Sequence, residues 1–584
     1  MADIEPAKSG TLLTTAPSVP DGHDISATGS AVGPLPSTDL EGSKPKLSIE
    51  PIDVADVADG ATARSGWRLY AILASLFLSL FVAALDQTIV ATCIPTIAAS
   101  LHSAQGYVWI GGAYLLATAA AGPIWARCSD IWGRKPALLA AIVLFAVASV
   151  IAATSINMPM MIAARALQGV AGGGVFPLVT ITISDLFSVR RRSLFMGLLA
   201  IVWAVAGSAG PLVGGAFTQL VSWRWCFWIN LPICGVSFLL VVLFLDVHNP
   251  RTKISDGLRA IDWLGTVTML AVTLMVLLGL DFGGATFPWS SPKVICLLAV
   301  GGAMVGAFIY SEAKFAKYPL MPLGLFGHWH NNAICIMSFA HNMVAIGCEF
   351  YLPLYFQSAK KATPLQSGLM LVPMMAAEAA IDIVSGLLIH YTGRYREMMW
   401  VGTALMTLGT GLYLLFTPDT PVRTIIGCEI VGGIGTALLF QSPMLAIQNT
   451  VVQSETATAT ATMGFLRNVA TALSVVLGGV ILQNSMDKEQ SSLVAAGLNS
   501  TTLAAFTGSH AAANVDLVAS ITDAAQKRAV EDAFAASLRN IFTMYAAIAG
   551  VAFIASIFVQ QRRLQTEHTE TKTGLDNLKQ RDGE

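Results

Sequence analysis

The chain has 584 residues, of which 54% are hydrophobic and only 12% are charged, about half the charged fraction of an ordinary soluble domain. This composition excludes a soluble globular protein and predicts that most of the chain lies in a lipid bilayer. The formal net charge of −2 gives no electrostatic basis for binding nucleic acid. The 8 cysteines show no CxxC or Cys/His ligand spacing, so we expect buried thiols, no metal and no cofactor.

Residues 1–66 differ in character from the rest of the chain. They are rich in Ser, Thr, Pro, Gly, Asp and Ala and show no apolar periodicity, which predicts a disordered tail. They lack the basic, apolar and small-residue regions of a signal peptide. We therefore expect the first membrane helix to act as its own insertion signal.

From residue 67 onward, long apolar segments follow one another, each near the ~20 residues that a bilayer-spanning helix needs. This pattern predicts an all-α polytopic membrane protein with about 14 transmembrane helices. The expected spans are approximately 69–97, 107–126, 136–155, 159–184, 194–219, 227–246, 262–280, 294–311, 332–357, 366–390, 398–416, 423–448, 459–483 and 540–560.

Basic residues are distributed unequally between the loops. The loops after even-numbered spans are rich in Arg and Lys, except residues 449–458, which carry no base. The loops after odd-numbered spans carry few bases, with Arg224, Lys360 and Lys361 as exceptions. By the positive-inside rule, both termini face the cytoplasm. The long loop 484–539 then lies outside, and it contains the sequon at Asn499, where we predict N-glycosylation. Residues 521–539 look helical and amphipathic, and we expect them to lie on the surface.

A weak internal repeat indicates the domain organisation. The motif Gly133-Arg134-Lys135 follows the second span, and Gly393-Arg394-Tyr395-Arg396 follows the tenth. Two related halves around a central site are a transporter plan. The predicted parts are an N-terminal six-helix bundle at 67–247, a linker at 248–330 with two extra helices, a C-terminal six-helix bundle at 331–560 and a cytoplasmic tail at 561–584.

Two charged residues within apolar segments point to function. Asp86 lies near the outer end of the first span and Arg165 near the start of the fourth. A charge at the centre of a membrane helix costs about 2.5–3.5 kcal/mol on insertion scales and usually marks a pathway or a proton relay. The topology gives both residues similar depth, so we expect a carboxylate–guanidinium pair in one membrane cavity.

Two further motifs lie near the gates and hinges that a transporter needs. In the loop after the second span, Asp130 can stabilise the start of the third helix, Gly133 permits a tight turn, and Arg134 and Lys135 can reach a neighbouring carboxylate or lipid phosphate. The fifth span carries a cluster of small residues and a proline, which favours close helix packing and a kink. This cluster contains Gly207, Gly210, Pro211, Gly214 and Gly215.

The second half contains several intramembrane acids and one base. Glu378 and Asp382 have i, i+4 spacing and share one helix face. We expect this pair, together with Glu349, to line the cavity and to take protons or bind a cationic part of a substrate. Glu429 is a further intramembrane acid, and we expect Arg467 to snorkel toward the cytoplasmic edge.

Taken together, these residues resemble the major facilitator superfamily, specifically its fourteen-span drug:proton antiporters of the fungal toxin-efflux type. The motifs that carry the resemblance are LDQTIVATCIP (85–95); Asp130, Gly133, Arg134 and Lys135; Arg165, Gln168 and Gly169; Gly207, Gly210, Pro211 and Gly214; and WRWCFWIN (223–230). Three positions depart from the family's gate motifs: Ala126, Ile131 and His390.

The resemblance implies that Asp86, Arg165 and Gln168 couple transport to protons, that the motif at 130–135 gates the cytoplasmic side, and that the fifth-helix motif marks an antiporter. It implies that the protein exports hydrophobic or amphipathic small molecules. We expect a monomer in the plasma membrane, with the vacuolar membrane as the alternative. The alternatives are an uptake symporter, for instance for siderophores, a nutrient sensor on a transporter fold, and a membrane enzyme. No GxxxxGK[ST] motif is present, which argues against an ATP-driven pump.

Overall fold

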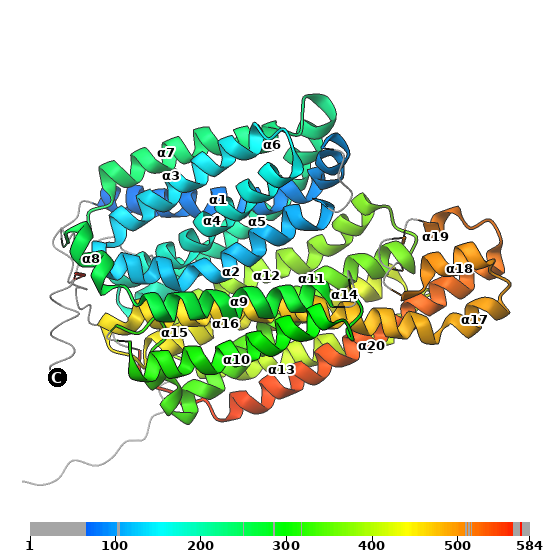
Figure 1. Ribbon diagram of the computed structural model, residues 1–584. Coiled ribbons are helices and arrows are strands. Elements are labelled where there is room, and N and C mark those ends of the chain that lie inside the picture. The colour runs from blue at the N-terminus through cyan, green and yellow to red at the C-terminus, as the bar shows by residue number, and fades with distance from the viewer. Residues whose placement is uncertain are drawn as a thin grey trace, which may run out of the picture. The chain divides into compact units, whose positions relative to one another are not determined.

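The computed structural model describes residues 66–564, apart from 102–105, 249, 251, 284–286, 317, 509–510, 512–513 and 516, together with residues 573–574. Nearly all of the predicted tail 1–66, and most of the tail 561–584, therefore lie outside the described residues. The described part is helical, and its one extended pairing is the isolated bridge between Gly283 and Phe287. Figure 1 shows the helices running alongside one another.

The described residues form 13 helices that are long and apolar enough to cross a membrane. They correspond to all the expected spans except the second. At that position lies α2 (Gly106–Trp132), a helix of 27 residues whose glycines, Arg127 and Asp130 lower its mean hydropathy. The predicted all-α polytopic fold is confirmed.

The N-terminal part of the described chain holds seven helices, because the sixth expected span is broken after Trp228. They are α1 (Gly66–Ser100), α2, α3 (Arg134–Ala153), α4 (Met158–Leu186), α5 (Val189–Leu220), α6 (Trp225–Trp228) and α7 (Asn230–Phe244). Three further helices follow before residue 320: α8 (Ile254–Ala260), α9 (Trp263–Phe282) and α10 (Pro292–Lys314). The longest of the first seven, α1 with 35 residues, spans about 50 Å and so exceeds the hydrocarbon core.

The C-terminal part begins with a 3-10 turn and contains two broken spans. Its elements are η2 (Leu323–Gly327), α11 (Trp329–Ser358), α12 (Pro364–Thr392), α13 (Arg396–Leu412), η3 (Tyr413–Leu415), α14 (Val422–Leu438), α15 (Ser442–Gln448), η4 (Gln453–Glu455), α16 (Thr456–Lys488), α17 (Gln490–Ala495), α18 (Ser500–Phe506), α19 (Leu517–Ser520) and α20 (Ala524–Ile557).

Local sequence explains where several helices begin and end. The Asn157 side chain accepts a hydrogen bond from the Met160 backbone N–H and caps α4. A capping box of Thr363 and Gln366 starts α12, which ends at Gly393 with φ of 67°, a left-handed conformation that glycine adopts without strain. These start and stop residues fix the helix ends that carry the motifs.

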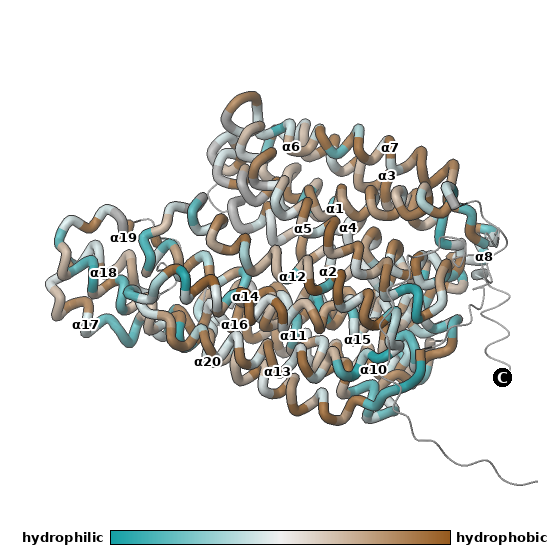
Figure 2. The backbone as a smooth tube through the Cα atoms, turned by 180° about the vertical axis from the view of Figure 1, so that it is seen from behind, coloured by the Kyte–Doolittle hydropathy of each residue, from teal (hydrophilic) through white to brown (hydrophobic). Residues whose placement is uncertain are grey.

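Helix packing divides the apolar core. One set of buried side chains comes mainly from α1 to α5 and α7, and a larger set comes mainly from α11 to α20. The first set meets the second where α5 packs against α12 and where α16 packs against α2 and α4. Helices α9 and α10 pack mainly on each other, and α9 also contacts α2 and α16. Figure 2 shows α3 and α7 as largely hydrophobic tubes, with hydrophilic residues gathered near α8 and along α17 and α18.

The loop expected at 484–539 is more ordered than predicted. Helix α16 continues to Lys488, three short helices follow, and α20 begins already at Ala524. The expected surface helix 521–539 is therefore largely the first half of α20 rather than a separate element. Its Phe534 is fully buried and meets Phe506 of α18 edge-on, with ring centroids 6.0 Å apart.

Candidate functional site

The centre of the N-terminal helices holds an ion pair away from solvent. Asp86 on α1 and Arg165 on α4 are 0% and 2% exposed. The Nη1 of Arg165 lies 2.6 Å from Oδ2 of Asp86. The structure thus brings together the two charges that the sequence placed at similar depth, and neither charge is left alone in the low-dielectric interior.

Amide side chains complete the coordination of the Asp86 carboxylate. Gln168 donates to Asp86 Oδ1 over 3.2 Å, and Asn230 at the start of α7 donates to the same oxygen over 2.8 Å. Both amides also lie within hydrogen-bond distance of Ser149 Oγ, at 2.9 Å and 3.3 Å. Of these partners, the sequence predicts only Gln168. Asn230 lies at the end of the aromatic segment 223–230, and its contact with Asp86 depends on the break between α6 and α7.

Helix α2 closes the other side of Arg165. The Arg165 Nε donates to the Ile110 carbonyl over 3.0 Å, and the guanidinium lies 4.4 Å from the centroid of the Tyr114 ring. This close approach depends on Gly169, since a Cβ there would lie 2.3 Å from the Tyr114 carbonyl oxygen. The glycine next to Gln168 thus lets α2 and α4 pack closely enough to enclose the pair.

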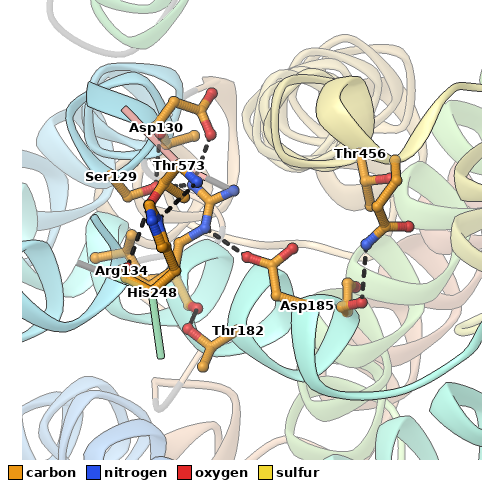
Figure 3. Close-up of polar contacts among 12 residues, drawn as sticks. Ser129, Asp130, Arg134, Thr182, Asp185, His248, Thr456 and Thr573 are labelled. Carbon is orange, nitrogen blue, oxygen red and sulfur yellow. Dashed lines mark hydrogen bonds and ion pairs between the residues drawn. The ribbon is translucent and has the colours of Figure 1, made fainter. Parts of the chain in front are cut away.

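The motif at 130–135 forms a second ionic network, shown in Figure 3. Arg134 donates through Nη1 to Asp130 and through Nε to Asp185 at the end of α4, both over 2.6 Å. Gly133 adopts φ of 97°, which an L side chain would resist. Lys135 lies outside the network and donates to the Val242 carbonyl. The sequence does not predict Asp185 as a partner of Arg134, because an acid at a helix end is common and does not by itself indicate an ion pair.

A short C-terminal segment contacts the same corner (Figure 3). The Gly574 N–H donates to the Asp130 carbonyl over 2.9 Å. The Thr573 N–H donates to His248 Nδ1, and the Thr573 hydroxyl donates to the His248 carbonyl, each over 3.2 Å. Thr573 is 7% exposed. The end of the described chain therefore lies against the motif at 130–135.

The small residues of α5 face neighbouring helices on two sides, and the approach is close at Gly210. A Cβ on Gly210 would lie 2.1 Å from the Thr88 hydroxyl of α1, and one on Gly207 would lie 3.7 Å from Met375 of α12. The Gly214 carbonyl accepts a hydrogen bond from Thr218. The side chain of Pro211 lies outside the described residues. The fifth-helix motif thus lies between α1 and α12.

At the predicted cytoplasmic end, α5 also binds the opposite bundle. Arg190 Nε donates to the His390 carbonyl over 2.6 Å, and Arg192 Nη2 donates to Gln453 Oε1 over 2.9 Å. Gln453 in turn donates to the Ser184 carbonyl over 3.3 Å. These bonds hold the two bundles together at this end. His390 contributes its backbone where the family pattern would place a carboxylate.

The predicted acids of the second half make separate contacts. Glu378 accepts a hydrogen bond from Thr436 of α14 over 2.6 Å and borders a small cavity beside Met374 and Tyr413. Asp382 accepts a hydrogen bond from Gln441, which follows α14. Both acids therefore face the α14 side of α12. Glu349 is half-buried on α11.

Two other charged groups of this half are buried. Glu429 is 0% exposed, and neither of its carboxylate oxygens has a hydrogen-bond partner among the described residues. Arg467 does not snorkel as predicted; it is 7% exposed. Its Nη2 donates to the Phe440 carbonyl over 2.6 Å and its Nε donates to the Ser338 hydroxyl over 3.1 Å. The break between α14 and α15 frees that carbonyl, which explains why the guanidinium turns inward.

Within the described residues, no three His, Cys, Asp or Glu side chains gather in a way that could hold a metal ion. The polar groups described above are ion pairs, amides and hydroxyls.

The family model described as Major Facilitator Superfamily matches residues 76–475. The chain therefore belongs to the major facilitator superfamily, and it is an integral, multi-pass membrane transporter. Within the superfamily, it is of the fungal efflux type.

The relatives that show this type are similar over most of their length. The chain is 42% identical to the MFS-type transporter ppz2 of Metarhizium majus (strain ARSEF 297), over 94% of each protein. It is 42% identical to the efflux pump dotC of Dothistroma septosporum (strain NZE10 / CBS 128990), over 89% of each. It is 33% identical to the efflux pump FUS6 of Gibberella moniliformis (strain M3125 / FGSC 7600), over 89% of this chain and 92% of the relative.

Solved structures share the fold at low sequence identity. The human organic anion transporter MFSD10 (TETRAN) aligns with a TM-score of 0.55 and 15% identity, over 83% of this chain and 99% of that one. The proton:xylose symporter XylE aligns with a TM-score of 0.53 and 13% identity, over 80% and 99%. At such identities the likeness shows the fold alone.

Proposed function

We propose that this transporter exports small hydrophobic or amphipathic molecules in exchange for protons. The observation that carries the proposal is the buried Asp86–Arg165 pair, with its 2.6 Å contact and its enclosing amides. The names of the relatives, efflux pump among them, support the outward direction of transport.

Protonation of Asp86 would remove one charge of the pair and leave Arg165 buried without its counter-ion. The uncompensated guanidinium then favours a conformation in which it reaches water or another acceptor. Because Asp86 lies on α1 and Arg165 on α4, a conformation that separates them changes how these two helices pack in the N-terminal bundle. A proton arriving from outside would thus shift the equilibrium between two conformations.

The bonds at the predicted cytoplasmic end are the ones that must break for the cavity to open inward. Arg190 and Arg192 donate across the bundle interface, and Arg134 fastens α3 to Asp185 of α4. In this proposal the motif at 130–135 is part of the gate, and the close contacts of Gly207 and Gly210 allow α5 to move against α1 and α12.

In this proposal Glu349, Glu378 and Asp382 line the substrate cavity, and each is a second candidate proton carrier. Both termini face the cytoplasm and the protein is a monomer in the plasma membrane, with the vacuolar membrane as the alternative. An uptake symporter is the second candidate, and it predicts inward rather than outward flux.

The test measures accumulation of a panel of hydrophobic toxins and dyes in cells with and without the transporter, with and without a protonophore. We expect lower accumulation in expressing cells, and we expect the protonophore to abolish the difference. Asp86→Asn should do the same, whereas Asp256→Asn, at an exposed acid of α8, should not. Higher accumulation in expressing cells would replace export by uptake. Protonophore-sensitive export that survives in Asp86→Asn would contradict the role of the pair.

A further inference from the structure

Every hydrogen bond that the described residues make with the Asp86 carboxylate comes from a donor. Arg165 Nη1 lies 2.6 Å from Oδ2, while the amide nitrogens of Asn230 and Gln168 lie 2.8 Å and 3.2 Å from Oδ1. An ionised carboxylate only accepts hydrogen bonds, so this arrangement suits the charged form. A protonated Asp86 carries an O–H, and that O–H needs an acceptor within the same buried site.

The two amides differ in how firmly their orientation is fixed. The Gln168 Oε1 accepts a hydrogen bond from Arg165 Nη1 over 2.9 Å, and a half-turn of this amide would bring its NH2 group against that donor. Asn230 is fully buried, and its Oδ1 has no hydrogen-bond partner among the described residues. No donor holds the Asn230 oxygen in place, so the protonation state of Asp86 decides which end of this amide faces the carboxyl group.

Asp86 is the group of this site that can gain a proton at neutral pH and below. The other titratable side chains around it are Arg165 on α4, Tyr114 on α2, Cys93 on α1, Cys226 on α6 and Cys234 on α7. A guanidinium stays charged, and phenols and thiols ordinarily lose their protons only above about pH 8. A proton that enters the site would therefore go to the carboxylate, and to Oδ1 in particular, because Oδ2 faces the guanidinium.

We propose that Asn230 is a positioning residue for proton coupling, whose amide makes a half-turn when Asp86 is protonated and accepts the new O–H through its Oδ1. Arg165 then loses its counter-ion, while α1 stays bonded to α7 through Asn230. Protonation thus loosens the contact of α1 with α4 but not its contact with α7. The inference rests on the proposed function, because it takes Asp86 as the proton carrier.

The test is infrared difference spectroscopy of the purified full-length protein, recorded between neutral and acid pH. We expect a carboxylic acid carbonyl band that is absent in Asp86→Asn. We also expect one side-chain amide carbonyl band to shift to lower frequency, because that carbonyl gains a hydrogen bond. Asparagine carrying a heavy isotope at its side-chain carbonyl carbon should move this amide band in the wild-type protein. The label requires no substitution, so this result does not depend on whether a variant folds.

Two matched variants separate the proposed role from simple donation. Asn230→Leu should remove the amide band shift, whereas Gln168→Met, which also removes an amide donor to Oδ1, should keep it. If Asn230 were only a donor, its shorter bond of 2.8 Å against 3.2 Å predicts that Asn230→Leu raises the pH at which half of the acid band appears by more than Gln168→Met does. The proposed acceptor predicts the reverse order. The midpoint in Asn230→Leu should lie about one pH unit below that in Gln168→Met, since leaving a buried O–H without an acceptor costs about tenfold in population.

An acid band from Asp86 without any change in a labelled asparagine carbonyl would overturn the role of Asn230 and leave the proposed function standing. A midpoint in Asn230→Leu above that in Gln168→Met would do the same. The absence of any acid band that depends on Asp86 would overturn both the inference and Asp86 as the proton carrier.

Discussion

Simultaneous replacement of both charges of the buried pair gives the sharpest stability test. Asp86→Asn leaves Arg165, 2% exposed, without a counter-ion, and Arg165→Gln leaves Asp86, 0% exposed, in the same position. Breaking a buried pair by removing one partner costs about 3–5 kcal/mol. In the double variant no charge remains, and two amides can still bond to Gln168 and Asn230.

We therefore expect each single variant to be strongly destabilised and the double variant to be less destabilised than the sum by about 2 kcal/mol or more, the upper part of the range for contacting residues. The assay is unfolding of the purified protein in detergent, with the four proteins compared under one condition. Additivity within about 0.5 kcal/mol would refute the reasoning, since the two charges would then not depend on each other. Proton-coupled export should stay absent in the double variant even where stability returns.

Three other predictions concern packing, surface charge and modification. Gly169→Ala should lower the unfolding temperature, because its Cβ would lie 2.3 Å from a carbonyl oxygen and overpacking costs about 1–3 kcal/mol. The control is Gly112→Ala, whose Cβ would have nothing within 4 Å. Equal effects of the two substitutions would contradict the packing argument. The hydrogen bond from Arg528 lowers the pKa of Asp419. This contact therefore stabilises the fold above the ordinary aspartate pKa, and the stabilisation is lost as the pH falls through the lowered pKa. The small difference in unfolding temperature between wild type and Asp419→Asn should vanish in acid and shrink in high salt, and a difference that grows in acid would contradict the predicted direction of the pKa shift. Asn499 is exposed and its Oδ1 accepts from the Thr501 hydroxyl over 3.1 Å, so an endoglycosidase should shift the mobility of wild type but not of Asn499→Gln; no shift in a eukaryotic host would count against the outer placement of this loop.

The sequence was most informative where a residue is unusual for its surroundings. Asp86 and Arg165 stand out in apolar helices, and topology alone gave them similar depth, so their pairing was predictable. Asn230 and Asp185 were not, because an amide after an aromatic run and an acid at a helix end are ordinary in sequence. Only the break after Trp228 and the packing of α3 on α4 bring them to Asp86 and Arg134.

Two predictions were wrong for the same reason, because each was based only on position relative to the predicted membrane edge. Arg467 was expected to reach the edge, but the interruption between α14 and α15 offers it a carbonyl inside. We expect 484–539 to be a long loop with one surface helix, but α16 and α20 extend beyond the bilayer thickness and the short helices α17 and α19 pack on α20, as does Phe506 of α18 through Phe534. Local hydropathy cannot predict either of these tertiary contacts.

The hydrogen bonds of Thr573 and Gly574 to His248 and to Asp130 near the end of α2 tie the last described residues to the N-terminal helices. A spectroscopic label at Thr573 would therefore travel with Asp130 and His248 rather than with α20, to which it is closer along the chain. Paired with a label at Thr392 at the end of α12, it would record a lengthening distance whenever Arg190 releases the His390 carbonyl. Labels at Thr573 and Thr392 would thus measure the distance between the N-terminal and C-terminal helices as they move.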